Sequence, residues 1–161
     1  MDRLWSPWRY RYVSTASADK ACIFCAKAAS AEDAENYIVL RARFNFILLN
    51  LYPYTNGHLM IAPYQHVAWL ADAGAETIEE MMRLTARAEL VLREVYQPGG
   101  LNIGMNLGEC AGAGVAGHVH MHVLPRWPGD ASFMTTVGET RLLPEELRVT
   151  WEKLKMAWPA G

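Results

Sequence analysis

The sequence contains few cysteines and no long apolar run, and each shortage excludes a class of protein. Its three cysteines among 161 residues cannot all pair with one another, which disfavours a secreted fold held by disulfide bonds. No apolar run approaches the roughly 18 residues of a membrane helix, and the N-terminal MDRLWSPWRYRYV lacks the apolar core of a signal peptide. We therefore expect a cytoplasmic protein that does not cross a membrane.

The sequence also lacks an excess of basic residues. Its formal net charge is -2 and its isoelectric point is about 6.2, whereas proteins that coat nucleic acid are usually basic. Hydrophobic residues make up 52% of the chain, which is enough for one core. The sequence predicts one domain over 1–161, with an N-terminal arm at 1–21 and no nucleic-acid partner.

Five apolar segments predict β-strands. YIVL and FNFILLN are rich in β-branched and aromatic residues, and only the segment 41–43 separates them, so we expect a hairpin. HLMIAP predicts a third strand that Pro63 ends. LNIGMNL at 101–107 and HVHMHVL at 118–124 predict two more strands, the second ended by Pro125.

Two helices complete the predicted antiparallel α+β domain. Over 76–96, apolar residues recur at spacings of three and four, and QPGG follows as a stop signal. Thr77 and Glu80 have the spacing of a capping box at the start of this helix. A C-terminal helix is expected over 144–158, with Pro144 at its start.

The stretch GHVHMHVLPRW contains three of the five histidines at a spacing of two. Alternate side chains of a strand share a face, so His118, His120 and His122 should point one way and the apolar residues between them into a core. Solvated strands also carry histidines, but this strict alternation favours a functional site. Three imidazoles could bind a catalytic zinc, or one imidazole could act as a nucleophile that its neighbours orient.

The segment before the histidines is rich in glycine. GECAGAGVAG, at 108–117, can bring backbone N–H groups close to an anion, as phosphate-binding loops do. A glycine-rich loop alone is a weak signal and is often only a turn. Beside three aligned histidines, it favours a substrate that carries phosphate over the substrate of a simple metal hydrolase.

Two motifs resemble those of a known family. HVHMHVL matches the pattern His-φ-His-φ-His-φ-φ, where φ is apolar, of the histidine triad (HIT) nucleotide hydrolases and transferases. NLYPYTNGHLMIAPYQH is similar to the family's other nucleotide-contacting stretch. PRWPGDASFM and the N-terminal LWSPWR most resemble the branch of bacterial dinucleoside tetraphosphate phosphorylases and fragile-histidine-triad hydrolases. The resemblance implies the antiparallel α+β HIT fold and a homodimer.

The resemblance also implies roles for the residues that match the family pattern. His120 would attack an α-phosphorus and form a covalent nucleotidyl-histidine, and His122 would hydrogen-bond the phosphate or bridging oxygens. Asn50 would contact the sugar of the bound nucleotide, and His58 would orient groups at the edge of the site. Asn106 would align with a polar side chain of the family if the loop before the triad has one extra residue.

One departure from the family pattern lies in that loop. Many members have a hydroxyl or amide side chain there that contacts phosphate, whereas this chain reads AGAGVAG. Backbone N–H groups, including that of Gly114, would have to replace it.

The implied reaction is cleavage of a dinucleoside polyphosphate such as diadenosine tetraphosphate, with water or phosphate as the acceptor. Two alternatives stay open. One is hydrolysis of a nucleoside phosphoramidate, and the other is a nucleotide-binding module without catalysis.

The motif CIFC, which runs from Cys22 to Cys25, is consistent with a zinc site, a redox pair or two buried thiols. Zinc-containing relatives in the family draw their ligands from a cysteine pair, a Pro-x-x-His histidine and the first triad histidine. His66, in PYQH, and His118 match these positions. The resemblance thus implies a structural zinc site of Cys22, Cys25, His66 and His118, with Cys110 left as a free thiol.

Overall fold

The computed structural model describes residues 21–131 and 144–159. Apart from Ala21, the predicted N-terminal arm lies outside these residues, as does the segment 132–143. None of the described helices has the length and apolar character needed to cross a membrane. The helices are α2 (Ile23–Ala29), α3 (Ala75–Tyr96) and α5 (Leu147–Ala157), with short 3-10 turns η1 (Leu70–Asp72) and η2 (Glu109–Ala111). The strands are β1 (Ile38–Arg41), β2 (Asn45–Leu49), β3 (Leu59–Pro63), β4 (Gly100–Gly104) and β5 (Met121–Arg126).

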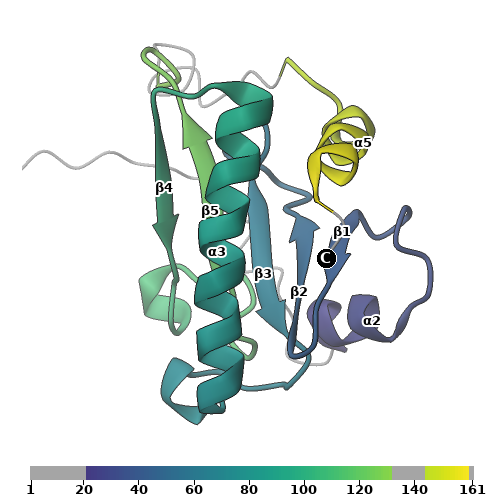
Figure 1. Cartoon of the computed structure of the whole chain (residues 1–161). Coiled ribbons are helices and arrows are strands. Elements are labelled where there is room, and N and C mark those ends of the chain that lie inside the picture. Colours follow the sequence, from purple (N-terminus) through teal and green to yellow (C-terminus); the bar gives the residue numbers. More distant parts are fainter. Residues whose placement is uncertain (1–20, 132–143, 160–161) are drawn as a thin grey trace, which may run out of the picture.

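The five strands form one sheet in the order β1-β2-β3-β5-β4, and every neighbouring pair is antiparallel. This confirms the predicted α+β class and the predicted hairpin of β1 and β2. Figure 1 shows the long helix α3 lying along one face of the sheet, with α5 beside it near β1. The short helix α2 contributes Phe24 to a cluster on the opposite face.

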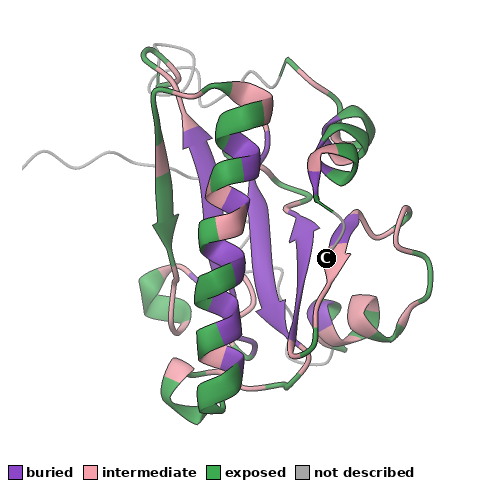
Figure 2. Ribbon diagram, in the orientation of Figure 1, coloured by how far each residue is buried: buried purple, intermediate pink, exposed green. Residues whose placement is uncertain are grey.

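Alternation along the strands divides the core between the two faces of the sheet. On β2, Ile47 and Leu49 pack with α3, whereas Phe46 and Leu48 pack with Phe24 of α2. The buried central strands and the buried sheet-facing side of α3 are visible in Figure 2. Met121 and Val123 of β5 join the α3 side, so the histidines that alternate with them lie on the α2 side.

The last central strand differs from its prediction at both ends. β5 begins at Met121, so His118 and His120 precede it, and it continues through Pro125 to Arg126. The carbonyl of Pro125 accepts the Thr55 hydroxyl at 2.9 Å, which places the carbonyl and the nitrogen of this residue on the side away from β4. The β3 pairing already stops at Val123, so the missing N–H of Pro125 costs no ladder bond.

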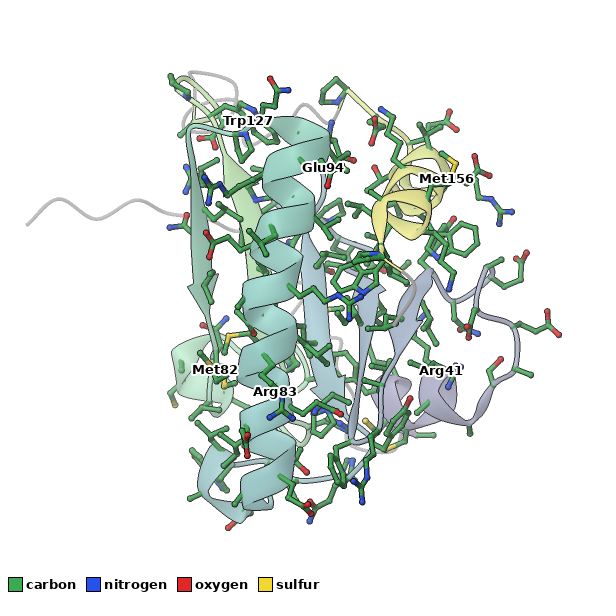
Figure 3. All side chains as sticks on the ribbon, viewed as in Figure 1. Arg41, Met82, Arg83, Glu94, Trp127 and Met156 are labelled. Carbon is green, nitrogen blue, oxygen red and sulfur yellow. The ribbon has the colours of Figure 1, made fainter. Side chains whose placement is uncertain are left out.

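Strand β4 and helix α5 also differ from their predicted ranges. β4 ends at Gly104 rather than at residue 107, and α5 begins at Leu147, three residues after Pro144, and ends at Ala157. The capping box was wrong, because Gly74 is the N-cap of α3 and its first helical residue is Ala75. Met82 and Arg83 occupy the outer side of α3, away from the sheet (Figure 3).

Glu80 is buried and binds the β1–β2 turn instead of capping α3. Its carboxylate accepts the backbone N–H groups of Arg43, Phe44 and Asn45 at 3.1, 2.8 and 2.9 Å, and also the Asn45 amide at 2.9 Å. These four hydrogen bonds fix the hairpin to the long helix. Replacing a carboxylate that accepts three main-chain N–H groups lowers the free energy of unfolding, because those donors lose their partner.

We therefore expect Glu80→Gln to lower the free energy of unfolding by about 2–4 kcal/mol, because the new amide N–H₂ opposes a backbone donor. The matched control is Glu79→Gln, which loses only an exposed pair with Arg83 and should cost less than about 0.5 kcal/mol. Urea denaturation of both variants measures the difference. Equal effects would show that the buried carboxylate does not hold the hairpin.

Candidate functional site

Four histidines gather on the face of the sheet that carries α2. The rings of His120 and His122 lie 4.8 Å apart between centroids, and those of His58 and His122 lie 5.1 Å apart. His58 comes from the turn before β3, whereas the triad leads into β5, which pairs with β3. Phe24 of α2 packs its ring against His118 and His120, at 5.1 and 4.8 Å.

The main chain sets the proton position on His120. Its Nδ1 lies 2.8 Å from the carbonyl oxygen of His118, and a carbonyl only accepts, so Nδ1 carries the hydrogen. The Nε2 lone pair is then left free. Burial lowers the pKa of His120, and the carbonyl contact raises it by less. The ring is therefore neutral near pH 7, and Nε2 is the nitrogen available to a substrate.

A chain of hydrogen bonds likewise orients His122. The backbone N–H of Tyr54 donates to Nδ1 of His58 at 3.2 Å, and the amide of Asn50 lies 3.4 Å from the same atom. Both groups are donors, so His58 carries its proton on Nε2, which lies 2.9 Å from Nδ1 of His122. His122 must then present an N–H at Nε2.

Burial, and next the neighbouring His120, lower the pKa of His122 to about 4. His122 is thus a neutral hydrogen-bond donor over the ordinary pH range. It stands beside a neutral imidazole whose Nε2 is a free acceptor. This combination suits attack on an electrophile whose leaving oxygen gains negative charge.

The other predicted nucleotide ligands differ in how closely they contact the histidines. Asn50 joins the histidine cluster through His58, and its Oδ1 accepts the N–H of Tyr52 at 3.0 Å. Asn106 lies beyond the end of β4 and lines a cavity together with His122. No hydrogen bond or ring contact among the described residues joins Gly114 to the histidines.

The loop that contains Gly114 nevertheless offers donors. Within 21–131 and 144–159, no acceptor binds the backbone N–H groups of 114–117, although the next N–H, that of His118, donates to Val115 at 3.3 Å. Free N–H groups in a glycine-rich loop are suited to phosphate oxygens. The loop therefore keeps the donors that its missing hydroxyl side chain would otherwise supply.

The four predicted metal ligands converge. The ligand atoms of Cys22, Cys25, His66 and His118 all lie within 4.8 Å of one another. Cys22 Sγ and His66 Nδ1 each lie 3.3 Å from Nδ1 of His118, and Cys25 Sγ lies 3.3 Å from Nδ1 of His66. Zinc bonds of about 2.0–2.3 Å in a tetrahedron separate their ligands by about 3.3–3.8 Å, so the group fits a zinc ion.

The orientation of His118 supports the same fit. Its Nε2 lies 2.9 Å from the carbonyl oxygen of Pro63, which therefore accepts the N–H and leaves Nδ1 free as a ligand. A zinc held by all three triad histidines is not favoured, because Nδ1, the free nitrogen of His118, faces Cys22 and His66. Cys110 is a free thiol, as predicted, and it is exposed.

Sequence reasoning missed three groups that position the site. From the sequence, Phe24 has no role beyond its place in CIFC. An aromatic residue between two ligand cysteines could have indicated a ring that packs against the neighbouring histidines. The Tyr54 N–H and the Pro63 carbonyl belong to the main chain, and no side-chain motif reveals which atom a backbone group will face.

A sheet of this topology with three aligned histidines defines a class of nucleotide-acting proteins. The chain belongs to the HIT domain family, whose sequence model matches residues 31–129. It is 39% identical to the AP-4-A phosphorylase of Mycobacterium tuberculosis, over 98% of this chain and 85% of that protein.

Two further relatives place the chain within the family. A Zn-bound histidine triad family protein from Mycobacterium smegmatis superposes with a TM-score of 0.70 and 30% identity, covering 86% of this chain and 93% of that one. The asymmetrical bis(5'-nucleosyl)-tetraphosphatase of Schizosaccharomyces pombe is 28% identical over 59% of this chain and 52% of its own length.

The lowered pKa of His122 gives a measurable pH dependence. With a pKa of about 4, the ring should remain about nine-tenths neutral at pH 5, and imidazole nitrogen NMR shifts across pH 4–8 would follow it. The folded pKa lies below that of an unfolded histidine, about 6.5, so the free energy of unfolding should fall as the pH drops from about 6.5 towards 4. A His122 inflection near pH 6.5 would contradict the half-buried, neutral donor.

Proposed function

We propose that the protein cleaves dinucleoside polyphosphates through a covalent nucleotidyl intermediate on His120. The observation that carries this proposal is the pairing of a free Nε2 on His120 with an N–H donor on His122. Membership of the HIT domain family and the similarity to a mycobacterial AP-4-A phosphorylase support the substrate class. Adenine nucleotides are the first substrates to test for that reason.

In the first step, Nε2 of His120 attacks the α-phosphorus. A nitrogen–phosphorus bond forms, and the bond from phosphorus to the bridging oxygen breaks. The positive charge that develops on the imidazole is stabilised at Nδ1–H by the carbonyl of His118. The N–H of His122 stabilises the charge on the departing polyphosphate oxygen, which is already a stable anion and needs no full proton transfer.

In the second step, an acceptor attacks the same phosphorus and the nitrogen–phosphorus bond breaks. The electron pair returns to Nε2 of His120. With water, diadenosine tetraphosphate would give adenosine monophosphate and triphosphate, and with inorganic phosphate it would give the diphosphate and triphosphate. The free N–H groups of 114–117 are suited to holding the phosphate oxygens in both steps.

The covalent step predicts a trapped adduct. Wild-type protein mixed briefly with diadenosine tetraphosphate should gain the mass of one adenylyl group, and peptide mapping should locate it on His120. His120→Asn should form no adduct and lose more than about a thousandfold in turnover.

His122→Asn is the control, because it keeps the nucleophile and should form the adduct more slowly. Nucleotide products with and without phosphate identify the acceptor. An adduct on another residue would refute the mechanism. Tight nucleotide binding with no turnover would instead indicate a non-catalytic module.

We further propose that Cys22, Cys25, His66 and His118 hold a structural zinc ion. The converging ligand atoms and the Zn-bound relative from Mycobacterium smegmatis support this. When bound, zinc would cross-link helix α2, the segment after β3 and the start of the triad. Reduced thiols at this site agree with a cytoplasmic location.

Metal analysis tests the zinc proposal. Protein purified without chelator should contain about one zinc per chain, and Cys25→Ser should lose most of it and unfold at a lower temperature. Cys110→Ser is the matched control, because this thiol is exposed and outside the cluster, and it should match the wild type. Equal zinc content in both variants would exclude the cluster as the metal site.

A homodimer is also part of the proposal. β4 is an edge strand with little burial, and its Ile103 is 45% exposed. An exposed apolar edge of this kind is suited to pairing with a second sheet.

A further inference from the structure

One large cavity near the histidines has no role in the reaction described above. It has a volume of about 600 Å³ and begins at His122, whereas His120 is not among its lining residues. A volume of this size lies within the range of about 300–1,000 Å³ that is usual for small-molecule sites. Its walls include aromatic rings and side-chain amides, from Tyr54, Tyr96, Trp127, Asn56, Asn102 and Asn106.

The charged groups of the cavity neutralise each other. Arg126 donates from Nε and Nη2 to the two oxygens of Asp130, at 2.6 and 2.7 Å. Hydrogen bonds from Arg126 lower the pKa of Asp130 to about 2, so the pair persists at any physiological pH. The other lining residues in the described part of the chain are uncharged, apart from the neutral His122. The cavity therefore suits an uncharged ligand group better than a phosphate.

The same arginine orients an amide towards the ligand. Nη1 of Arg126 lies 2.6 Å from Oδ1 of Asn102, and a guanidinium only donates, so the oxygen of that amide must face it. The N–H₂ group of Asn102 then points elsewhere as a donor. It is available to donate to an acceptor on the ligand, such as a ring nitrogen or carbonyl of a nucleobase.

Hydrogen bonds and a ring contact hold Tyr96 and Trp127 in place. The hydroxyl of Tyr96 donates to Glu145 at 2.6 Å, and the backbone N–H of Trp127 donates to Asp130 at 3.1 Å. The rings of Tyr96 and Trp127 meet edge to face, 6.2 Å apart. Figure 3 shows Trp127 at the far end of β5, near the C-terminal end of α3. Fixed rings beside fixed donors are pre-organised for a planar ligand.

The direction of the cavity identifies which half of the substrate it would receive. Asn50 and His58 do not line the cavity, which begins at His122 and extends along β5 to Trp127. Trp127 directly follows β5 and lies five positions after His122, or about 16 Å along an extended chain. His122 is also the residue that faces the departing oxygen in the proposed reaction.

We propose that this cavity binds the nucleoside of the departing half of a dinucleoside polyphosphate. The inference rests on the proposed function and adds the subsite that distinguishes a dinucleotide from a mononucleotide. The departing phosphates lie at the His122 end, and the neutral base and ribose lie between the aromatic walls and the Asn102 amide.

Two substrates that differ only in the second nucleoside test this subsite. Diadenosine tetraphosphate has it and adenosine 5'-tetraphosphate lacks it, so the ratio of their kcat/KM values isolates its binding. In Trp127→Leu and in Asn102→Asp, which keeps the acceptor for Arg126 but loses the N–H₂ donor, the ratio should fall about five- to tenfold. Trp69→Leu is the matched control, because Trp69 is exposed and lines a different surface hollow.

The outcomes separate the two proposals. A wild-type protein that turns over neither substrate refutes the proposed function. A wild-type protein that cleaves both equally well, or cavity variants that keep the wild-type ratio, overturns the subsite while the reaction stands. A fall in the ratio with Trp69→Leu as large as that with Trp127→Leu also overturns it.

Discussion

The hydrogen bond from Nδ1 of His120 to the carbonyl of His118 is the interaction on which the site depends. At 2.8 Å, it fixes the tautomer of His120, the plane of its ring and the nitrogen that is free to attack. The bond also joins two sites, because the side chain of His118 belongs to the cysteine–histidine cluster. Whatever holds His118 therefore also holds the acceptor for His120. The alternating histidines therefore divide between two groups, since His118 lies with the cysteines and His122 with His58, and they do not form one cluster of three equivalent ligands.

Main-chain groups also determine which ring nitrogen of His118 and of His58 carries the proton. The Pro63 carbonyl decides which nitrogen of His118 is free, and the Tyr54 N–H decides which nitrogen of His58 donates to His122. Burial lowers the pKa of His118, His120 and His122, so protonation near pH 7 does not undo the tautomers of these three rings. Backbone atoms are rigid, and a side-chain partner would have to be ordered at an entropic cost.

Sequence patterns could predict the parts of this arrangement that depend on local periodicity. The alternation in HVHMHVL places Met121 and Val123 in the α3 core. The resemblance to zinc-containing relatives, rather than any local pattern, indicated that Cys22 and His66 lie in one cluster. Other features depend on contacts between distant segments. Glu80 was assigned to a helix cap, but the turn before β2 competes for its carboxylate. Pro125 was expected to end a strand, and only the early end of the β3 pairing lets it continue. The cavity walls come from α3, β4 and the chain after β5, which no local pattern connects.

The contacts around the nucleophile also explain how a polyanion could be processed and released. The described residues that make ring contacts or hydrogen bonds with His120 and His122 are Phe24, Tyr54, His58 and His118, and none of them is a lysine or arginine. Arg126, the arginine that lines the adjacent cavity, is neutralised by Asp130. Phosphate charge would therefore meet N–H dipoles, which bind without the strength of a buried ion pair. Dipoles oriented in advance stabilise the charge that develops on a departing oxygen. Because the same dipoles bind the finished product less tightly than fixed cations would, the site combines stabilisation of the transition state with release.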